Sequence, residues 1–252
     1  MTASASVDEL AAEQRALQDC VRSLEPDAWL QPTPARGWDV RDTIAHLADV
    51  DEMAMATVED GGAAPRALNA IAARAASPDD VTFLGVMRAR RLAGADVLAW
   101  WERVAAEERA LFSTLDPEAR VEWGIGMRAG TLVSARLMET WAHGLDVRAA
   151  IGAPSHDTDR LAHVAWLATR ALPYAYTVAG REPPSGALRV ELVLPSGAPW
   201  AYGPDDAPNR ITGDAAEYCR VFVQRLPRAR AVTLVAVGAG ADAALDVARA
   251  YL

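Results

Sequence analysis

Three residues that can bind a metal ion lie at helical spacing in the segment 137–146. Glu139, His143 and Asp146 occur there within the sequence LMETWAHGLD. At about 100° per residue, their side chains fall within about 60° of one another on a helix surface. Carboxylate and imidazole groups that converge in this way are typical ligands of zinc and related divalent metals.

The helix that would carry these residues is apolar around most of its circumference. Leu137, Trp141 and Leu145 occupy the side opposite to the two acids and the histidine. Such a helix should be largely buried, and charged groups that face a core are costly unless something compensates them. A bound divalent metal would provide that compensation.

The spacing alone leaves another arrangement open for the two acids. Glu139 and Asp146 could pair with nearby arginines, such as Arg136 and Arg148, or face solvent. In that case the helix would carry surface ion pairs and no metal.

A further candidate ligand, His46, lies in the sequence GWDVRDTIAHL. It is about 100° or more from the apolar positions Ile44 and Leu47 on a helix, which by itself predicts a surface or boundary histidine. Together with the later Glu-x-x-x-His pair, however, it would give three ligands from two facing helices. Three protein ligands leave coordination positions open for water or substrate, as in catalytic metal sites.

The first part of the chain is helical in pattern and should position these residues. Apolar spacing and turn residues predict helices over about 7–24, 39–60, 81–115 and 131–151, with 63–80 left unassigned. Helices of this length and spacing indicate an antiparallel four-helix bundle within a domain of residues 1–155.

The composition changes after residue 155, where proline, glycine and alternating patterns become frequent. Residues 188–194 alternate between apolar and polar side chains, the period of a half-buried strand. Further strands are expected near 200–202, 210–212 and 232–237, and helices over 158–172, after 213–214 and over 241–251. The expected fold class is therefore mainly α with a small α+β domain at 156–252.

Composition excludes several classes of function. The 252 residues carry a formal net charge of −9, which disfavours non-specific binding to nucleic acid or to an anionic membrane surface. All 25 basic residues are arginine, so chemistry that depends on lysine, such as a Schiff base, is impossible. Cys20 and Cys219 are expected to be buried and reduced. No segment reads as a signal peptide or membrane span, so a cytoplasmic protein is expected.

Two motifs resemble those of a known family. Gly37-Trp38 followed by His46-Leu47, together with Glu139-x-x-x-His143-x-x-Asp146, resembles the DinB-like, mycothiol-dependent maleylpyruvate isomerase family of actinobacterial metalloproteins. The resemblance implies a DinB-like four-helix metal-binding bundle followed by a sterol-carrier-protein-like α/β domain. It also implies that His46, Glu139 and His143 bind a divalent metal, usually zinc. Asp146 would hold a ligand imidazole or serve as a further ligand.

The resemblance further implies a reaction. In such proteins the metal binds and deprotonates a small thiol, mycothiol, for S-transfer to a small electrophilic substrate or for its isomerisation. Arg225 lies near the position of an active-site arginine of the family and would bind the carboxylated thiol, although neighbouring arginines compete for this role. Trp141 could line the pocket for the thiol.

Other functions remain open at this level. One alternative is a thiol-independent, metal-assisted hydrolase, lyase or rearrangement enzyme. Another is a protein that binds a metal or ligand without turnover. A small-molecule substrate and a monomer or homodimer are expected in the enzyme interpretations. A second site at His156 and His163 is not favoured, because His156 follows Pro154-Ser155 in an expected loop.

Overall fold

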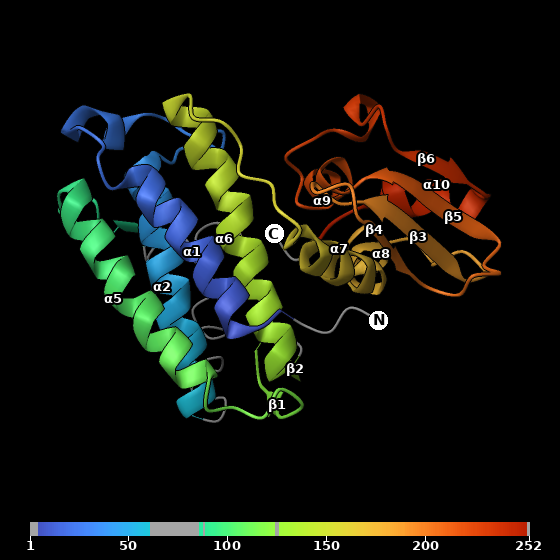
Figure 1. Ribbon diagram of the computed structural model, residues 1–252, viewed down its shortest axis with the longest axis horizontal. Coiled ribbons are helices and arrows are strands. Elements are labelled where there is room, and N and C mark those ends of the chain that lie inside the picture. The colour runs from blue at the N-terminus through green and yellow to red at the C-terminus, as the bar shows by residue number, and fades with distance from the viewer. Residues whose placement is uncertain (1–4, 61–85, 88, 124–125, 251–252) are drawn as a thin grey trace. The chain divides into compact units, whose positions relative to one another are not determined.

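The structure is a computed structural model that describes residues 5–60, 86–87, 89–123 and 126–250. These residues fall into two compact units, one before and one after the boundary between His156 and Asp157, and each unit is described by itself below (Figure 1). The mainly helical class with a small sheet, expected from the sequence, is confirmed.

The first unit is a bundle of long helices whose ends are fixed by local sequence. Ser6 and Asp39 each form a capping box with the acidic residue three positions later, so the first two long helices begin sharply. Gly152 ends the last one in the left-handed conformation. The elements are α1 (Val7–Val21), the 3₁₀ turn η1 (Pro26–Leu30), α2 (Val40–Glu59), α5 (Gly94–Phe112), a small hairpin of β1 (Arg120–Val121) and β2 (Met127–Arg128), and α6 (Ala129–Ile151).

Helices α1 and α6 run parallel, and α2 and α5 run parallel to each other in the opposite direction (Figure 1). The start of α1 meets the start of α6, where the Ala5 amide donates to the Ser134 hydroxyl at 2.8 Å. The expected alternation of direction along the chain is therefore wrong for α2 and α5. The chain between Glu59 and Gly94 is long enough to return to the end at which α2 begins.

The third helix expected from the sequence is interrupted by a turn, since residues 86, 87 and 89 are helical and α5 begins only at Gly94. Residues 81–85 lie outside the described residues, but the chain turns at Arg90 and the helix α5 starts at Gly94. The Arg90 guanidinium binds the carboxylate of Asp42 at 2.7 Å and the carbonyl of Gly37 at 3.0 Å. These contacts fix Arg90 against the start of α2, and so the helix is interrupted there.

The start of α5 packs closely against a buried tryptophan. A methyl group added at Gly94 would lie 2.1 Å from the Trp29 ring. We expect Gly94→Ala to lower the free energy of unfolding by about 1–3 kcal/mol, because the ring must move within a packed core. Gly144→Ala on α6 is the matched control, since its nearest contact is 3.7 Å away, and it should be neutral or stabilising by about 0.5–1 kcal/mol. Equal urea midpoints for the two variants would contradict this packing.

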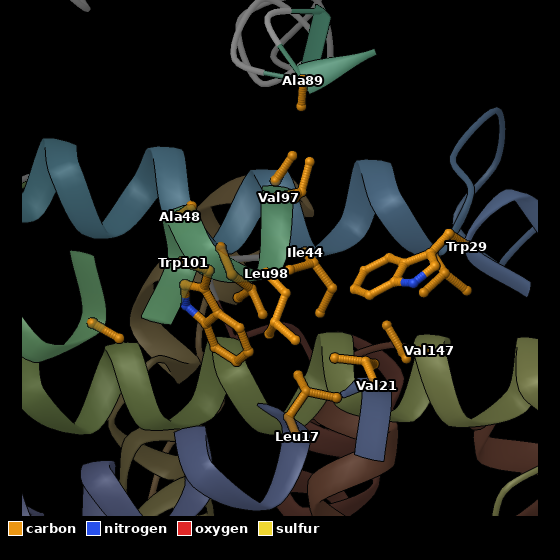
Figure 2. Packing of buried hydrophobic residues seen from close by; sticks show 14 residues of the cluster. Leu17, Val21, Trp29, Ile44, Ala48, Ala89, Val97, Leu98, Trp101 and Val147 are labelled. Atoms are coloured by element: carbon orange, nitrogen blue, oxygen red, sulfur yellow. The ribbon is translucent and has the colours of Figure 1, made fainter. Parts of the chain in front are cut away.

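The core of the bundle joins the four long helices that the structure describes. Leu17, Ile44, Leu98 and Val147 come from α1, α2, α5 and α6 and belong to one cluster of buried side chains. Figure 2 shows them between the indole rings of Trp29 and Trp101 and the surrounding helices. This contiguous packing sets the distance between the helices that carry the candidate ligands.

The second unit is a mixed sheet with helices. The strand order is β4-β3-β5-β6, in which β3 and β5 are parallel and the other pairs antiparallel. Asp214 caps the helix that follows β5, as its sequence position predicts. The elements are α7 (Leu161–Arg170), α8 (Leu172–Val178), β3 (Leu188–Val193), β4 (Pro199–Tyr202), β5 (Asn209–Asp214), α9 (Ala215–Phe222), η2 (Arg228–Arg230), β6 (Val235–Val237) and α10 (Ala239–Asp246).

Three boundaries in this unit differ from those expected. The segment 158–172 was expected as one helix, but Ala171 separates α7 from α8, which begins just before Pro173. The expected strand 232–237 forms only at Val235–Val237, where it pairs with β5. The last helix starts at Ala239 and ends at Asp246, well before the residue 251 expected from its apolar pattern.

Candidate metal centre

His46, Glu139 and His143 meet in the bundle. One ligand atom from each lies within 4.8 Å of the others. The Oε2 atom of Glu139 is 3.4 Å from Nε2 of His143 and 3.9 Å from Nε2 of His46. Two imidazole nitrogens and a carboxylate oxygen at these separations can turn toward one metal ion.

Helices α2 and α6 bring the three side chains together. Glu139 and His143 are one turn apart on α6, and His46 faces them from the antiparallel α2. Taken alone, the periodicity of α2 predicts a surface or boundary histidine at this position, and that prediction is wrong because only 7% of His46 is exposed. Its burial comes from α6 and from the ring of Trp38, which precedes α2. The periodicity of α2 alone reveals neither contact.

The electrostatics of the cluster suit a cation. Burial lowers the pKa of His46 from 6.5 to about 4, although the hydrogen bond with Glu139 opposes this shift. Burial would raise the pKa of Glu139, but hydrogen bonds with the two histidines and the charge of Arg136 hold it well below its usual value. At neutral pH the site therefore presents an ionised carboxylate and a neutral His46 imidazole, the protonation states that metal ligands need.

Asp146 lies against the Nδ1 side of the His143 ring. Its Oδ2 atom is 3.3 Å from Nδ1 of His143, the ring nitrogen that faces away from the cluster, and the Asp146 side chain is 2% exposed. A carboxylate in this position orients an imidazole and raises its basicity toward a metal. Of the two roles left open by the sequence, the geometry favours the one through His143.

We expect Asp146→Asn to weaken zinc binding without abolishing it. The amide lacks the negative charge that Asp146 places 3.3 Å from Nδ1 of His143, so the affinity for Zn²⁺ should fall about 10–100-fold. Competition with a chromophoric zinc chelator measures this. Asp8→Asn makes the same chemical change on the exposed first turn of α1 and should bind as the unmodified protein does. Identical affinities for the two variants would exclude the proposed role of Asp146.

The aromatic ring against the histidines is that of Trp38. Its centroid is 4.9 Å from the His46 ring and 6.1 Å from the His143 ring, and it is nearly parallel to the latter. The Trp38 carbonyl accepts hydrogen bonds from the Thr33 amide and hydroxyl. The next residue, Asp39, is the N-cap of α2. Trp38 belongs to the Gly37-Trp38 motif, but no role for it could be predicted from the sequence, in which its one distinguishing feature is its place next to the cap of α2.

The remaining predicted residues have other surroundings. Trp141 is 3% exposed. Around the axis of α6 its side chain lies about 200° from that of His143, on a different side of the helix, so its place in a pocket stays a prediction. Arg225 belongs to the second unit, where its Nη1 donates to the Val223 carbonyl at 2.8 Å. Its role toward a thiol also stays a prediction.

The arginines offered as alternative partners of the acids bind elsewhere. Arg136 forms an ion pair with Asp51, with Nη2 2.7 Å from Oδ1. Arg148 donates to the Ala16 carbonyl at 2.9 Å and contacts Cys20. Glu139 and Asp146 instead lie against the imidazoles of His46 and His143, which favours the metal interpretation of the α6 motif.

Fold and cluster together define a class of protein: a helical bundle with a buried His-Glu-His cluster, followed in the chain by a small α/β unit. The family described as mycothiol maleylpyruvate isomerase N-terminal domain matches residues 10–148, and the chain belongs to this family. None of the described helices has the length and hydropathy needed to cross a membrane.

Similar proteins are found by sequence and by structure. Uncharacterized proteins from two Mycobacterium tuberculosis strains are each 36% identical over 251 residues, covering 97% of this chain and 94% of the relative. The crystal structure of the mycothiol-dependent maleylpyruvate isomerase aligns with a TM-score of 0.58 at 15% identity, over 91% of this chain and 90% of that one. A histidine-to-alanine mutant of that enzyme gives 0.57 at 14% identity over the same shares. These structures share the fold.

Proposed function

We propose that the protein is a metal-dependent enzyme that uses a small thiol of the mycothiol type for S-transfer to, or isomerisation of, a small electrophilic substrate. The observation that carries the proposal is the buried His46, Glu139 and His143 cluster, with Asp146 behind one imidazole. Membership of the family supports it, as does a structural neighbour that is named a mycothiol-dependent maleylpyruvate isomerase.

The chain's own residues divide the work at this site. His46 and His143 would hold the metal through nitrogen atoms and Glu139 through oxygen, and three protein ligands would leave a position open for an external ligand. A divalent metal bound there would act as a Lewis acid that lowers the pKa of a thiol. Asp146 keeps the His143 ring in orientation, and Trp38 packs against both imidazoles.

Two further roles belong to the proposal. Arg225 would bind the carboxylate of the thiol cofactor, since a guanidinium recognises a carboxylate with paired hydrogen bonds. Trp141 would line the pocket for the same cofactor. Zinc is the proposed metal, because two imidazoles and one carboxylate are ligands that it accepts readily.

The first test of the proposal is spectroscopic and needs no substrate. The protein is loaded with Co²⁺ in place of zinc, and mycothiol is added. We expect a new thiolate-to-cobalt absorption band that saturates at one thiol per chain, because thiolate takes the open ligand position. The same titration with Glu139→Ala should give no band.

A turnover assay then separates the candidate reactions. Maleylpyruvate is the first substrate to try, since a structural neighbour is named for it. We expect conversion that needs both the metal and mycothiol. Conversion without thiol would favour the metal-assisted hydrolase or lyase alternative, and a cobalt protein that gives no thiolate band would contradict thiol activation.

A further inference from the structure

A second group of buried polar side chains lies deeper in the bundle than the metal cluster. It joins the four long helices α1, α2, α5 and α6 of the described part of the chain and includes a cation and two carboxyl groups, none of them more than 1% exposed. Buried charges are rare and costly, so a role for them is expected. The members are Gln14 from α1, Asp51 from α2, Trp101 and Glu108 from α5, and Arg136 from α6.

The strongest contact in this group joins α2 to α6. Arg136 Nε donates to Asp51 Oδ1 at 2.8 Å, and Nη2 lies 2.7 Å from the same oxygen. The second oxygen of Asp51 accepts from the Trp101 indole at 3.0 Å. Asp51 therefore has partners on both oxygens, and the pair is fixed in one geometry.

Glu108 contributes less to this contact. Its Oε1 atom is 3.6 Å from Arg136 Nε, and its Oε2 atom accepts from Gln14 at 3.0 Å. Burial and the neighbouring Asp51 raise the pKa of Glu108 well above its usual value, which disfavours its charged form. The charge pair is Asp51 with Arg136, and Glu108 comes from α5, which carries no metal ligand.

The pair lies close to the metal cluster on the same two helices. Arg136 precedes Glu139 by three residues on α6, and Asp51 follows His46 by five residues on α2. Because α2 and α6 are antiparallel, both offsets lead in the same direction, about 4.5 Å and 7.5 Å along the helix axes. The proximity is also seen in the charge of Arg136, which helps to lower the pKa of Glu139.

We propose that Asp51 and Arg136 are positioning residues that fix α2 against α6, so that His46 on one helix meets Glu139 and His143 on the other. A buried ion pair seldom adds stability over apolar side chains of the same volume, but it can select a single arrangement of helices. A metal site needs such selection, because its ligands must be held to within a fraction of an ångström. The inference rests on the proposed metal site.

The test compares two variants that make the same chemical change. Asp51→Asn removes the α2–α6 ion pair, while Arg136 can still be neutralised by Glu108. Glu108→Gln replaces a carboxyl group with an amide of nearly the same shape and leaves the pair of Asp51 with Arg136 intact. We expect the first variant to bind Zn²⁺ about tenfold or more weakly, the range seen when groups that orient ligands are lost, and the second to bind as the unmodified protein does.

A spectroscopic measurement distinguishes positioning from a general structural effect. The Co²⁺ absorption spectrum of Asp51→Asn should change in shape and intensity, because the ligand geometry changes, whereas Glu108→Gln should keep the original spectrum. If Asp51→Asn does not fold, the pair is replaced as a unit with Asp51→Leu and Arg136→Met, for which the same loss of affinity is expected.

The outcomes separate this inference from the proposed function. A lower melting temperature of Asp51→Asn with unchanged zinc affinity and cobalt spectrum would overturn the positioning role alone. An equal loss of affinity in both variants would also overturn it, since Glu108 does not link the two ligand helices. Failure of the unmodified protein to bind zinc or cobalt would overturn the proposed function itself.

Discussion

Replacing His46, Glu139 or His143 with alanine should in each case lower the affinity for the metal more than about 100-fold. The loss of a group that only orients a ligand already lowers this affinity about 10–100-fold. Each substitution removes one of three donor atoms that lie within 4.8 Å of one another. Two protein ligands and solvent hold a divalent metal poorly at neutral pH. Elemental analysis of the purified chains should show about one zinc per chain in the unmodified protein and almost none in the variants.

The control for this experiment is His156→Ala. His156 is exposed, precedes the second unit and is not part of the cluster. Its replacement should leave the zinc content unchanged, so that a general loss of purity or folding can be recognised. Full zinc content in any of the three ligand variants would show that the metal is held elsewhere and would remove the basis of the proposed enzyme.

The motif on α6 could be predicted from sequence because it depends on local geometry. A residue four positions after another lies on the same side of a helix in any fold. Glu139 and His143 are therefore neighbours wherever α6 forms. Asp146 follows from the same geometry. The apolar surroundings of this helix correctly indicated that these polar groups lie in the interior.

The burial of His46 depends on contacts between segments far apart in the chain. Its position on α2 suggests a boundary residue, yet α6 covers one side of it and Trp38 another. The parallel course of α2 and α5 is likewise set by tertiary packing, which joins Asp51 of α2 to Trp101 of α5. Periodicity in one helix does not record which neighbours that helix will have.

The buried ion pair could have been found from its positions along the helices. Asp51 continues the apolar spacing of Ile44 and Leu47, and Glu108 continues that of Leu98 and Trp101. An acid at a core position of an amphipathic helix predicts a buried partner of opposite charge. The identity of that partner could not be predicted from the sequence, because Arg136 lies 85 residues from Asp51 along the chain.

Arg136→Met should lower the free energy of unfolding by about 3–5 kcal/mol, because it leaves Asp51 buried without its cation. The side chains of Arg136 and Asp51 are 2% and 0% exposed, so solvent cannot replace the lost partner. Exposed ion pairs behave differently and contribute only about 0–1 kcal/mol. Arg103→Met is the matched control, since Arg103 pairs with Glu107 at the surface, with side chains 56% and 52% exposed.

The double variant with Asp51→Leu and Arg136→Met tests the cause of that loss. If the uncompensated carboxylate destabilises Arg136→Met, removing both charges together should recover most of the stability. Urea unfolding followed by the far-ultraviolet circular dichroism of the helices measures all of these variants in parallel. A double variant as unstable as Arg136→Met would mean that the packing of the arginine side chain, and not the charge left on Asp51, accounts for the effect. Recovered stability combined with weakened zinc binding would show that the ion pair is kept for the geometry of the metal site, since the bundle folds equally well without it.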